Sequence, residues 1–351
     1  MYRTLFLLVL IFLFLTSSIY ATDPRPVPPP APVLSLVDPN KQGYDIPEGI
    51  ERQHVCTLNA VEVLLRKYRP SFPDTPEHQM ALLAIDEVLH YSNPEARESK
   101  AVKSFLKCRL RFAIEEMRHT KVTSGAVIWK LYDHAFVVRT ASVTFAFDLT
   151  RGYAPDADFD GLSAEIIDQC DVLFISHEHG DHYDPWVVQR FREQGKPVYM
   201  PGSLERDGVT KHRISLSGGR ELNMVVFPGY QKDLINDVRL VITSESLSFV
   251  HTGDLFKGSN TPADMFKWID SIRDTYSVDV LLVNVWVTTL PRVVRGLGPN
   301  LVMTGHENEM GHTVQDRKPY HMSYDRLRGV AVPGIVAAWG ESYYYSAPSA
   351  K

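Results

Sequence analysis

Apolar residues recur at helical spacing between residues 47 and 120, and at strand spacing or in short unbroken runs from residue 121 onward. In the first segment, Thr75-Pro76-Glu77 and Asn93-Pro94-Glu95 carry the cap, proline and acidic residues that begin helices. The apolar positions behind them are Met80, Leu83, Ile85, Val88 and Leu89, then Val102, Phe105, Leu106, Leu110, Ala113 and Met117. We therefore predict a helical segment over residues 47–120 that packs on the rest of the protein.

The second segment, residues 121–351, predicts strands joined by short turns and then strands alternating with helices. The predicted strands are Ala126–Tyr132, Ala135–Thr140, Val143–Asp148, Val172–Ser176, Pro197–Met200, Val238–Thr243, Ser246–His251 and Val278–Val285. Thr261-Pro262-Ala263-Asp264 predicts the start of a helix that runs to about Tyr276. This order of elements indicates an α/β fold.

The chain begins with the features of an export signal. An apolar run from Leu5 to Leu15 follows Arg3 and precedes a short polar stretch that ends at Ala21. This run is shorter than the ~20 residues of a membrane span, so residues 1–21 are predicted to be a cleaved signal peptide, with an uncleaved anchor as the alternative. Residues 22–46 are predicted to be a proline-rich linker that spaces the folded part away. We expect a secreted or periplasmic protein that has no stable membrane insertion after cleavage.

The net charge restricts the expected binding partners, and the cysteine content restricts the possible disulfides. The formal net charge of the 351 residues is −5, and no long basic run is present, which disfavours nucleic acid and leaves a small molecule as the expected partner. The oligomeric state is not indicated. Three cysteines in an exported protein allow one disulfide, predicted between Cys56 and Cys108. Cys170, which precedes a buried strand, is predicted to be buried and free.

A dense group of metal-binding residue types follows the apolar run at residues 171–176. His177, His179, Asp181 and His182 lie within six residues. In an extended segment the first two histidines point to the same side and can meet at one ion. The glycine that follows them lets the chain turn, so that Asp181 and His182 face a second position nearby. The cluster predicts a hydrolytic metal centre rather than a solvated loop.

These residues form the H-x-H-x-D-H motif of the metallo-β-lactamase-fold hydrolases, and the chain resembles that family. Three further stretches stand in the family's order: Phe145-Ala146-Phe147-Asp148, His251-Thr252-Gly253-Asp254 and Thr304-Gly305-His306. The resemblance covers residues 125–345 and comes nearest to the subgroup of ascorbate-phosphate lactonases and phospholipase D-like members. It implies an αββα sandwich for residues 121–351, with residues 47–120 as an N-terminal helical extension.

The resemblance also implies a role for each residue. The implied ligands are His177 and His179 for a first ion, Asp181, His182 and His306 for a second, and Asp254 as the bridge between them. Asp181 and Asp254 are the candidate catalytic residues, with Asp181 orienting the attacking hydroxide. Asp148 is expected to fix a ligand histidine rather than to bind metal. The implied cofactor is Zn²⁺, as one or two ions, and Mn²⁺ or Fe²⁺ is also compatible with these ligands.

The chain departs from the family at one ligand. Gln231 stands where the family has another histidine, at the end of a strand before the bridging aspartate. An amide oxygen is a weaker zinc ligand than an imidazole nitrogen. Three arrangements stay open: Gln231 or Tyr230 coordinates weakly, His212 or His251 completes the site, or only one ion binds. Strand alternation favours a packed role for His251, and the charged neighbours of His212 favour a solvated one.

Two more histidines are candidates for substrate contact. His134 lies in an Asp-His-Ala stretch similar to one in the lactonase subgroup, and a structural role is equally compatible. His312 follows His306 by six residues and either lines the pocket mouth or bonds to the backbone.

The predicted function is an exported metal-dependent hydrolase, in which a metal-bound hydroxide attacks the carbonyl or phosphoryl centre of an ester, lactone or phosphodiester. The alternative is a non-catalytic binding or scaffold protein whose metal site has partly decayed, with Gln231 as the first sign of decay.

Overall fold

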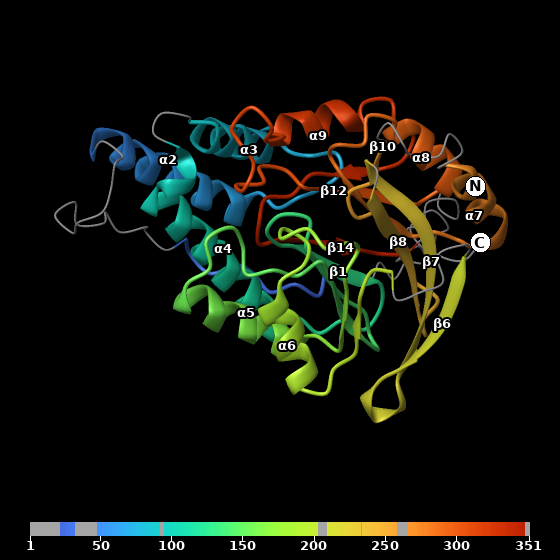
Figure 1. Ribbon diagram of the computed structural model, residues 1–351. Helices are drawn as coiled ribbons and strands as arrows, with labels where there is room; N and C mark the ends of the chain where they lie inside the picture. Colours follow the sequence, from blue (N-terminus) through green and yellow to red (C-terminus); the bar gives the residue numbers. More distant parts are fainter. Residues whose placement is uncertain are drawn as a thin grey trace, which may run out of the picture.

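The protein is described by a computed structural model over residues 22–31, 48–91, 95–202, 209–232, 234–257 and 266–347. Its helices are α2 (Glu48–Lys67), α3 (Pro76–Leu89), α4 (Lys100–His119), α5 (Ala157–Gln169), α6 (Pro185–Glu193), α7 (Lys267–Thr275), α8 (Leu290–Leu297) and α9 (Tyr320–Leu327). Two β-sheets pack face to face between them, with α2 to α6 against one sheet and α7 and α8 against the other (Figure 1). This arrangement confirms the predicted α/β class and αββα sandwich, with N-terminal helices added.

Over the described residues, the first sheet has six strands. Their spatial order is β14 (Glu341–Tyr345), β1 (Ala126–Lys130), β2 (Phe136–Arg139), β3 (Thr144–Phe147), β4 (Val172–Phe174) and β5 (Val198–Tyr199). Neighbours are antiparallel from β14 to β3 and parallel from β3 to β5. Alternation along β1 sends Ile128 into the core between the sheets, and Val127 and Trp129 into the core under the helices.

The second sheet has eight strands in the part of the chain that the structure describes. Their order is β10 (Phe256–Lys257), β7 (Glu221–Lys232), β8 (Leu234–Thr243), β9 (Ser248–His251), β11 (Val280–Asn284), β12 (Leu301–Gly305) and β13 (Gly334–Ile335), and β6 (Thr210–Ser215) also pairs with β7. The run β9, β11, β12, β13 is parallel. Both faces of β11 are buried, Leu282 against the first sheet and Leu281 against α7 and α8, as a central parallel strand requires.

The described part of the helical segment, residues 48–91 and 95–120, forms one continuous core with the first sheet. Thr75 caps α3 as predicted, and its hydroxyl accepts a hydrogen bond from His78 N at 3.2 Å. The start predicted near Asn93 is wrong for the next helix, because α4 begins at Lys100, where the Ser99 hydroxyl caps Val102 N. Asn93 itself and the predicted helix start at residues 261–264 lie outside the described residues.

Some positions of the predicted apolar stripes face solvent. Met80 and Leu83 on α3 are 63% and 45% exposed, whereas Leu82, Ile85 and Leu89 are fully buried. The buried face of α3 therefore follows the 82, 85, 89 register, and the two exposed residues lie on the other side of the helix.

Charged side chains are also buried in the helical layer, each beside an opposite charge. Glu62 accepts from Arg66 Nε at 2.7 Å and from Arg109 Nη1 at 3.1 Å. His78 lies between Asp74 and Glu341, 2.9 Å from each, and so ties α3 to β14. Burial opposes the charged form of this imidazole, but Glu341 and Asp74 outweigh it and raise the pKa of His78 to about 10.

The first described residues, 22–31, lie against the folded protein. Arg25 donates to the Ser342 carbonyl, Arg69 to the Pro26 carbonyl and Arg66 to the Pro29 carbonyl. This part of the predicted spacer is therefore docked on α2 and β14 rather than extended away from them. The predicted signal peptide, residues 1–21, lies outside the described residues. No helix in the described part of the chain is long and apolar enough to cross a membrane.

The predicted disulfide between Cys56 and Cys108 is wrong. Both thiols are free, because Cys56 is on the solvent side of α2 while Cys108 is buried on α4. Cys170 is free and buried, as predicted.

Candidate metal centre

The predicted ligands lie at the carboxyl ends of strands from both sheets. Asp148 follows β3 and His177 follows β4 in the first sheet, and Asp254 follows β9 and His306 follows β12 in the second. Parallel neighbours end at the same edge, so the polar residues after them gather there. Gly253 has a positive φ of 52°, and a side chain there would collide with Asn236, so the turn before Asp254 requires glycine.

Asp148 orients two of the histidines. Its Oδ2 lies 2.7 Å from His182 Nδ1 and accepts the Ser176 hydroxyl at 2.6 Å. Because the Ser176 hydroxyl donates its hydrogen to Asp148, its oxygen accepts a hydrogen bond from His177 Nδ1 at 3.0 Å. Both rings therefore carry a hydrogen on Nδ1 and turn Nε2 toward the site. Burial and the nearby His182 lower the pKa of His177 to about 3, so this imidazole is neutral.

Asp254 lies at the centre of the cluster. Its Oδ1 is 3.3 Å from His182 Nε2, and its Oδ2 is 3.1 Å from His306 Nε2 and 3.9 Å from His177 Nε2. Asn236 Oδ1 accepts the Asp254 backbone N–H at 3.1 Å and holds the carboxylate in place. Asp254 is thus shared by histidines from both sheets, as a bridging carboxylate would be.

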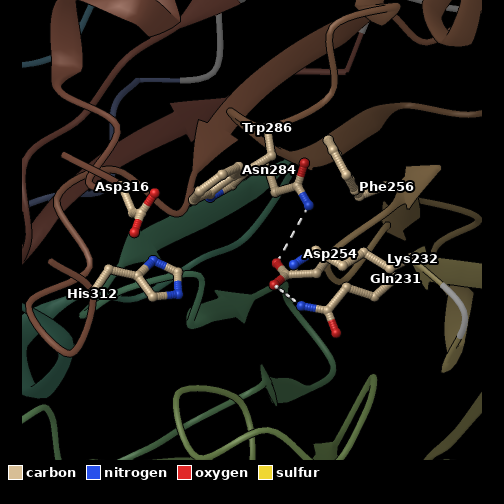
Figure 2. A pocket seen from close by; sticks show the side chains of 8 residues that line it. All are labelled: Gln231, Lys232, Asp254, Phe256, Asn284, Trp286, His312 and Asp316. Carbon is tan, nitrogen blue, oxygen red and sulfur yellow. Dashed lines mark hydrogen bonds between the residues drawn. The ribbon is translucent and has the colours of Figure 1, made fainter. Parts of the chain in front are cut away.

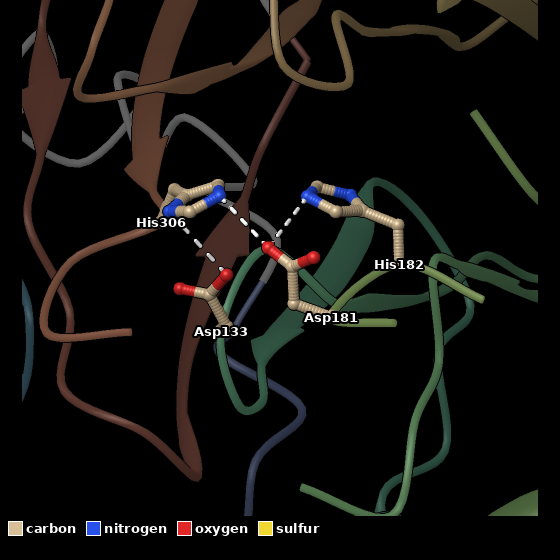
Figure 3. Close-up of side chains that lie close together, drawn as sticks. All are labelled: Asp133, Asp181, His182 and His306. Carbon is tan, nitrogen blue, oxygen red and sulfur yellow. Dashed lines mark ion pairs between the residues drawn. The ribbon is translucent and has the colours of Figure 1, made fainter. Parts of the chain in front are cut away.

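Asp181 lies between the same two rings from the open side. Its Oδ2 is 3.3 Å from His182 Nε2 and 3.2 Å from His306 Nε2 (Figure 3). Its side chain is 19% exposed, whereas those of His182 and His306 are fully buried. Asp181 therefore connects the buried cluster to solvent.

The donor set fits a cation. Among the described residues, none of the carboxylates of Asp133, Asp181 and Asp254 pairs with a lysine or arginine, and their ionic neighbours are all histidines. His177 Nε2 and His182 Nε2 are buried and have no hydrogen-bond partner in the described part of the chain. Buried polar groups are normally paired or coordinate a metal ion. Unpaired ring nitrogens in this position are therefore expected of metal ligands. Two groups have the spacing of a metal site: Asp133, Asp181, His182 and His306, and His177, His182 and Asp254.

The two sides of the site differ in completeness. His179 is half-buried with its ring centre 4.7 Å from that of His177, and it belongs to neither group. Gln231 turns its amide nitrogen to Asp254 Oδ2 at 3.0 Å, and its buried Oε1 has no hydrogen-bond partner within the described ranges. His212 lies on β6 outside both groups, and Tyr230 packs against the outer core of the second sheet. The contacts of Asp181 and Asp254 with His182 and His306 are therefore shorter, at 3.1 to 3.3 Å, than the 3.9 Å between Asp254 and His177.

A pocket of about 250 Å³ opens beside Asp254 (Figure 2). It is lined by Gln231, Lys232, Asp254, Phe256, Asn284, Trp286, His312 and Asp316. His312 stacks on His306 with ring centres 6.0 Å apart and lies at the edge of Trp286, with 5.6 Å between centres. His312 thus lines the pocket, one of the two positions the sequence left open for it.

His134 and His251 lie beneath the site and away from this pocket. Their ring centres are 4.4 Å apart, and His251 stacks on Phe147 at 4.7 Å, which is a packed environment. A side chain at Gly305 would collide with His134 Nδ1, so the glycine of the Thr-Gly-His motif makes room for this ring. His134 is fully buried, and burial with the nearby His251 lowers its pKa well below the ordinary value, so it is a neutral packed ring.

The sequence did not identify Asp133 or Asn284 as site residues. Asp133 is fully buried 3.4 Å from His306 Nδ1, and Asn284 Nδ2 donates to Asp254 Oδ1 at 3.3 Å. The only signal for Asp133 was a charged residue next to a histidine between two predicted strands. Asn284 was marked only as a polar residue near the end of an apolar strand.

No protein-family model and no curated protein matches the sequence. The structure is similar to Igni18, a metallo hydrolase from Ignicoccus hospitalis, with 14% identity, a TM-score of 0.47 and coverage of 64% of this chain and 100% of that one. It is also similar to CmlA, a diiron beta-hydroxylase from Streptomyces venezuelae, with 16% identity, a TM-score of 0.44 and coverage of 64% and 55%. A metallo-beta-lactamase from Pontibacter korlensis matches with 17% identity, a TM-score of 0.29 and coverage of 56% and 98%.

Proposed function

We propose that this protein is a metal-dependent hydrolase that works with one ion, held by Asp181, His182, Asp254 and His306. The observation that carries the proposal is the convergence of both carboxylates on the two Nε2 atoms, with contacts of 3.1 to 3.3 Å. Two imidazoles and two carboxylates suit Zn²⁺, Mn²⁺ or Fe²⁺. When bound, such an ion would lower the pKa of a water to about 7 and polarise a carbonyl or phosphoryl oxygen.

The chain's own residues divide the remaining work. Asp181 reaches solvent and is placed to orient the attacking water and take its proton. Asp254 stays buried and is fixed by Asn236, so it keeps the two histidines from the two sheets in register. The pocket of about 250 Å³ suits a small molecule, and we propose an ester, lactone or phosphodiester as the substrate class.

The test combines metal analysis with turnover. Protein purified without chelator should carry one ion per chain and hydrolyse at least one member of an ester, lactone and phosphodiester panel. Asp254→Ala should lose the ion and all turnover, while Asp325→Asn, an exposed change on α9, should keep both. Full activity in Asp254→Ala contradicts the hydrolase proposal. An ion without turnover on any substrate supports the binding or scaffold alternative instead.

Export is proposed as well. The support is the apolar run of residues 5–15 and the short polar stretch that follows it. Intact mass of the native protein should place the mature N-terminus near Thr22, and retention of Met1 in a membrane fraction contradicts cleavage.

A further inference from the structure

Asp133 is a buried acid for which the proposed chemistry has no use. Its side chain is fully buried, and neither carboxylate oxygen has a hydrogen-bond partner among the described residues. The backbone joins it to the metal centre, because His306 N donates to the Asp133 carbonyl at 3.0 Å. The carboxylate faces the same residue, with Oδ2 3.4 Å from His306 Nδ1 (Figure 3). An unpaired buried carboxylate is costly, so its place beside this ring calls for a reason.

A competing donor approaches the same ring nitrogen. Trp286 Nε1, which can only donate, lies 3.2 Å from His306 Nδ1. This contact requires a lone pair on Nδ1, and a neutral ring then carries its hydrogen on Nε2. The contact with Asp133 requires the reverse, a hydrogen on Nδ1 and a lone pair on Nε2. The two contacts therefore belong to different tautomers of His306.

Only one of these tautomers can bind metal at the proposed site. His306 Nε2 faces Asp181 and Asp254, so a ligand at this site must offer its lone pair on Nε2. A neutral metal ligand then carries a hydrogen on Nδ1, which Trp286 cannot accept and Asp133 can. At 3.4 Å the Asp133 contact is slightly longer than an ordinary N–H···O bond of 2.7 to 3.2 Å, and a shift of a few tenths of an ångström closes it.

We propose that Asp133 is a positioning residue that accepts the Nδ1 hydrogen of His306 and thereby presents Nε2 to the ion, in competition with Trp286. The inference rests on the proposed function for the ion, and adds the residue that selects the metal-binding tautomer. Asp148 already does the same for His182 from the first sheet, at 2.7 Å. Both orienting carboxylates would then come from the first sheet, Asp148 after β3 and Asp133 between β1 and β2.

The two neighbours of His306 predict opposite effects on metal affinity. Asp133→Asn and Asp133→Ala should weaken Zn²⁺ binding by about 10- to 100-fold, the usual effect of removing a carboxylate behind a ligand histidine. Trp286→Phe removes the competing donor and should leave Zn²⁺ affinity equal or higher. Asp148→Asn is the positive control and Asp325→Asn the neutral one. Affinity is measured by competition with a chromophoric chelator, with circular dichroism confirming the fold of each variant.

A second readout follows the tautomer directly. Long-range ¹H–¹⁵N spectra of Zn²⁺-loaded wild-type protein should show His306 protonated on Nδ1 and coordinated through Nε2. Asp133→Ala, at Zn²⁺ concentrations that saturate it, should show a His306 Nδ1 hydrogen that exchanges faster with solvent. A structural role alone would not move this signal.

Failure of the inference and failure of the proposed function look different. Wild-type affinity in both Asp133 variants, or an Nδ1 lone pair on His306 in the loaded protein, overturns the role of Asp133 and leaves the hydrolase proposal standing. Wild-type protein that binds no Zn²⁺, Mn²⁺ or Fe²⁺ overturns the proposed function and the inference together. If the Asp133 variants fail to fold, a drop in Zn²⁺ affinity for Trp286→Phe still contradicts the proposed competition.

Discussion

Two buried polar clusters in this protein contain similar side chains but are balanced in different ways. In the helical layer, Glu62 lies between two guanidinium groups, Arg66 and Arg109. At the strand ends, Asp181 and Asp254 have only histidines as ionic neighbours among the described residues. The carboxylate of the first cluster is paired with cations of the chain itself, whereas the carboxylates of the second would need a cation from outside, so we call them the complete and the incomplete cluster. A buried carboxylate therefore indicates function only after its partners have been identified.

The largest expected effect tests the complete cluster. Arg109→Met leaves Glu62 buried with one partner fewer, and should lower the free energy of unfolding by about 3 to 5 kcal/mol in urea denaturation. Metal content per folded chain should not change. Arg118→Met on the same helix removes an exposed ion pair and should cost less than about 1 kcal/mol. Loss of bound metal in folded Arg109→Met would show that the two clusters depend on each other.

A pH series tests the same layer through His78. The folded-state pKa of this residue is raised to about 10, so its contribution to stability is present in full below about pH 6.5 and is lost as pH rises toward 10. The slope is at most about 1.4 kcal/mol per pH unit. The free energy of unfolding of wild-type protein, minus that of His78→Gln, should fall between pH 7 and pH 10. A difference that stays flat shows that the imidazole between Asp74 and Glu341 is neutral when folded.

Metal addition tests the incomplete cluster. An ion that binds only the folded chain stabilises it by about 2.7 kcal/mol at a free concentration of 100 Kd. Chelator-treated protein should therefore unfold at a lower temperature and recover when Zn²⁺, Mn²⁺ or Fe²⁺ is returned. Asp254→Ala should show no such recovery. Equal recovery in that variant places the ion elsewhere in the protein.

The smallest effect concerns the weaker side of the metal centre. Gln231→His replaces an amide that donates to Asp254 with an imidazole that can bind zinc, so metal content should rise from one ion toward two. Gln231→Leu, which offers no ligand, should stay at one ion. Turnover in Gln231→His should stay within about tenfold of wild type, because the proposed reaction uses the other side. Two ions in unaltered protein would show that Gln231 does not limit the first position.

The sequence predicted the parts of the site that are local in the chain. His177, His182 and Asp181 lie in one short motif, and the resemblance supplied Asp254, His306 and Asp148 from recognisable strand ends. Asp133 escaped notice because its significance depends on His306, far along the chain, and on a backbone contact that only the fold creates.

The errors at the level of the fold have the same origin. The spacing of cysteines does not reveal that Cys56 faces solvent on α2 while Cys108 is buried on α4. Helix-start residues at Asn93-Pro94-Glu95 were a reasonable signal, yet Ser99 caps α4 instead. Both outcomes are set by tertiary packing, which overrides local preference.

The two histidines of the proposed ligand set come from opposite layers of the sandwich, His182 from the loop after β4 and His306 from the end of β12. An ion bound by both histidines would hold the two layers together at this edge of the sandwich. Rings such as Phe147 and Phe249 fill the core between the sheets. A smaller side chain in place of such a ring would therefore change the distance between His182 and His306 before it unfolds the protein. Natural selection for catalytic activity would then act on residues in that core that never touch a substrate.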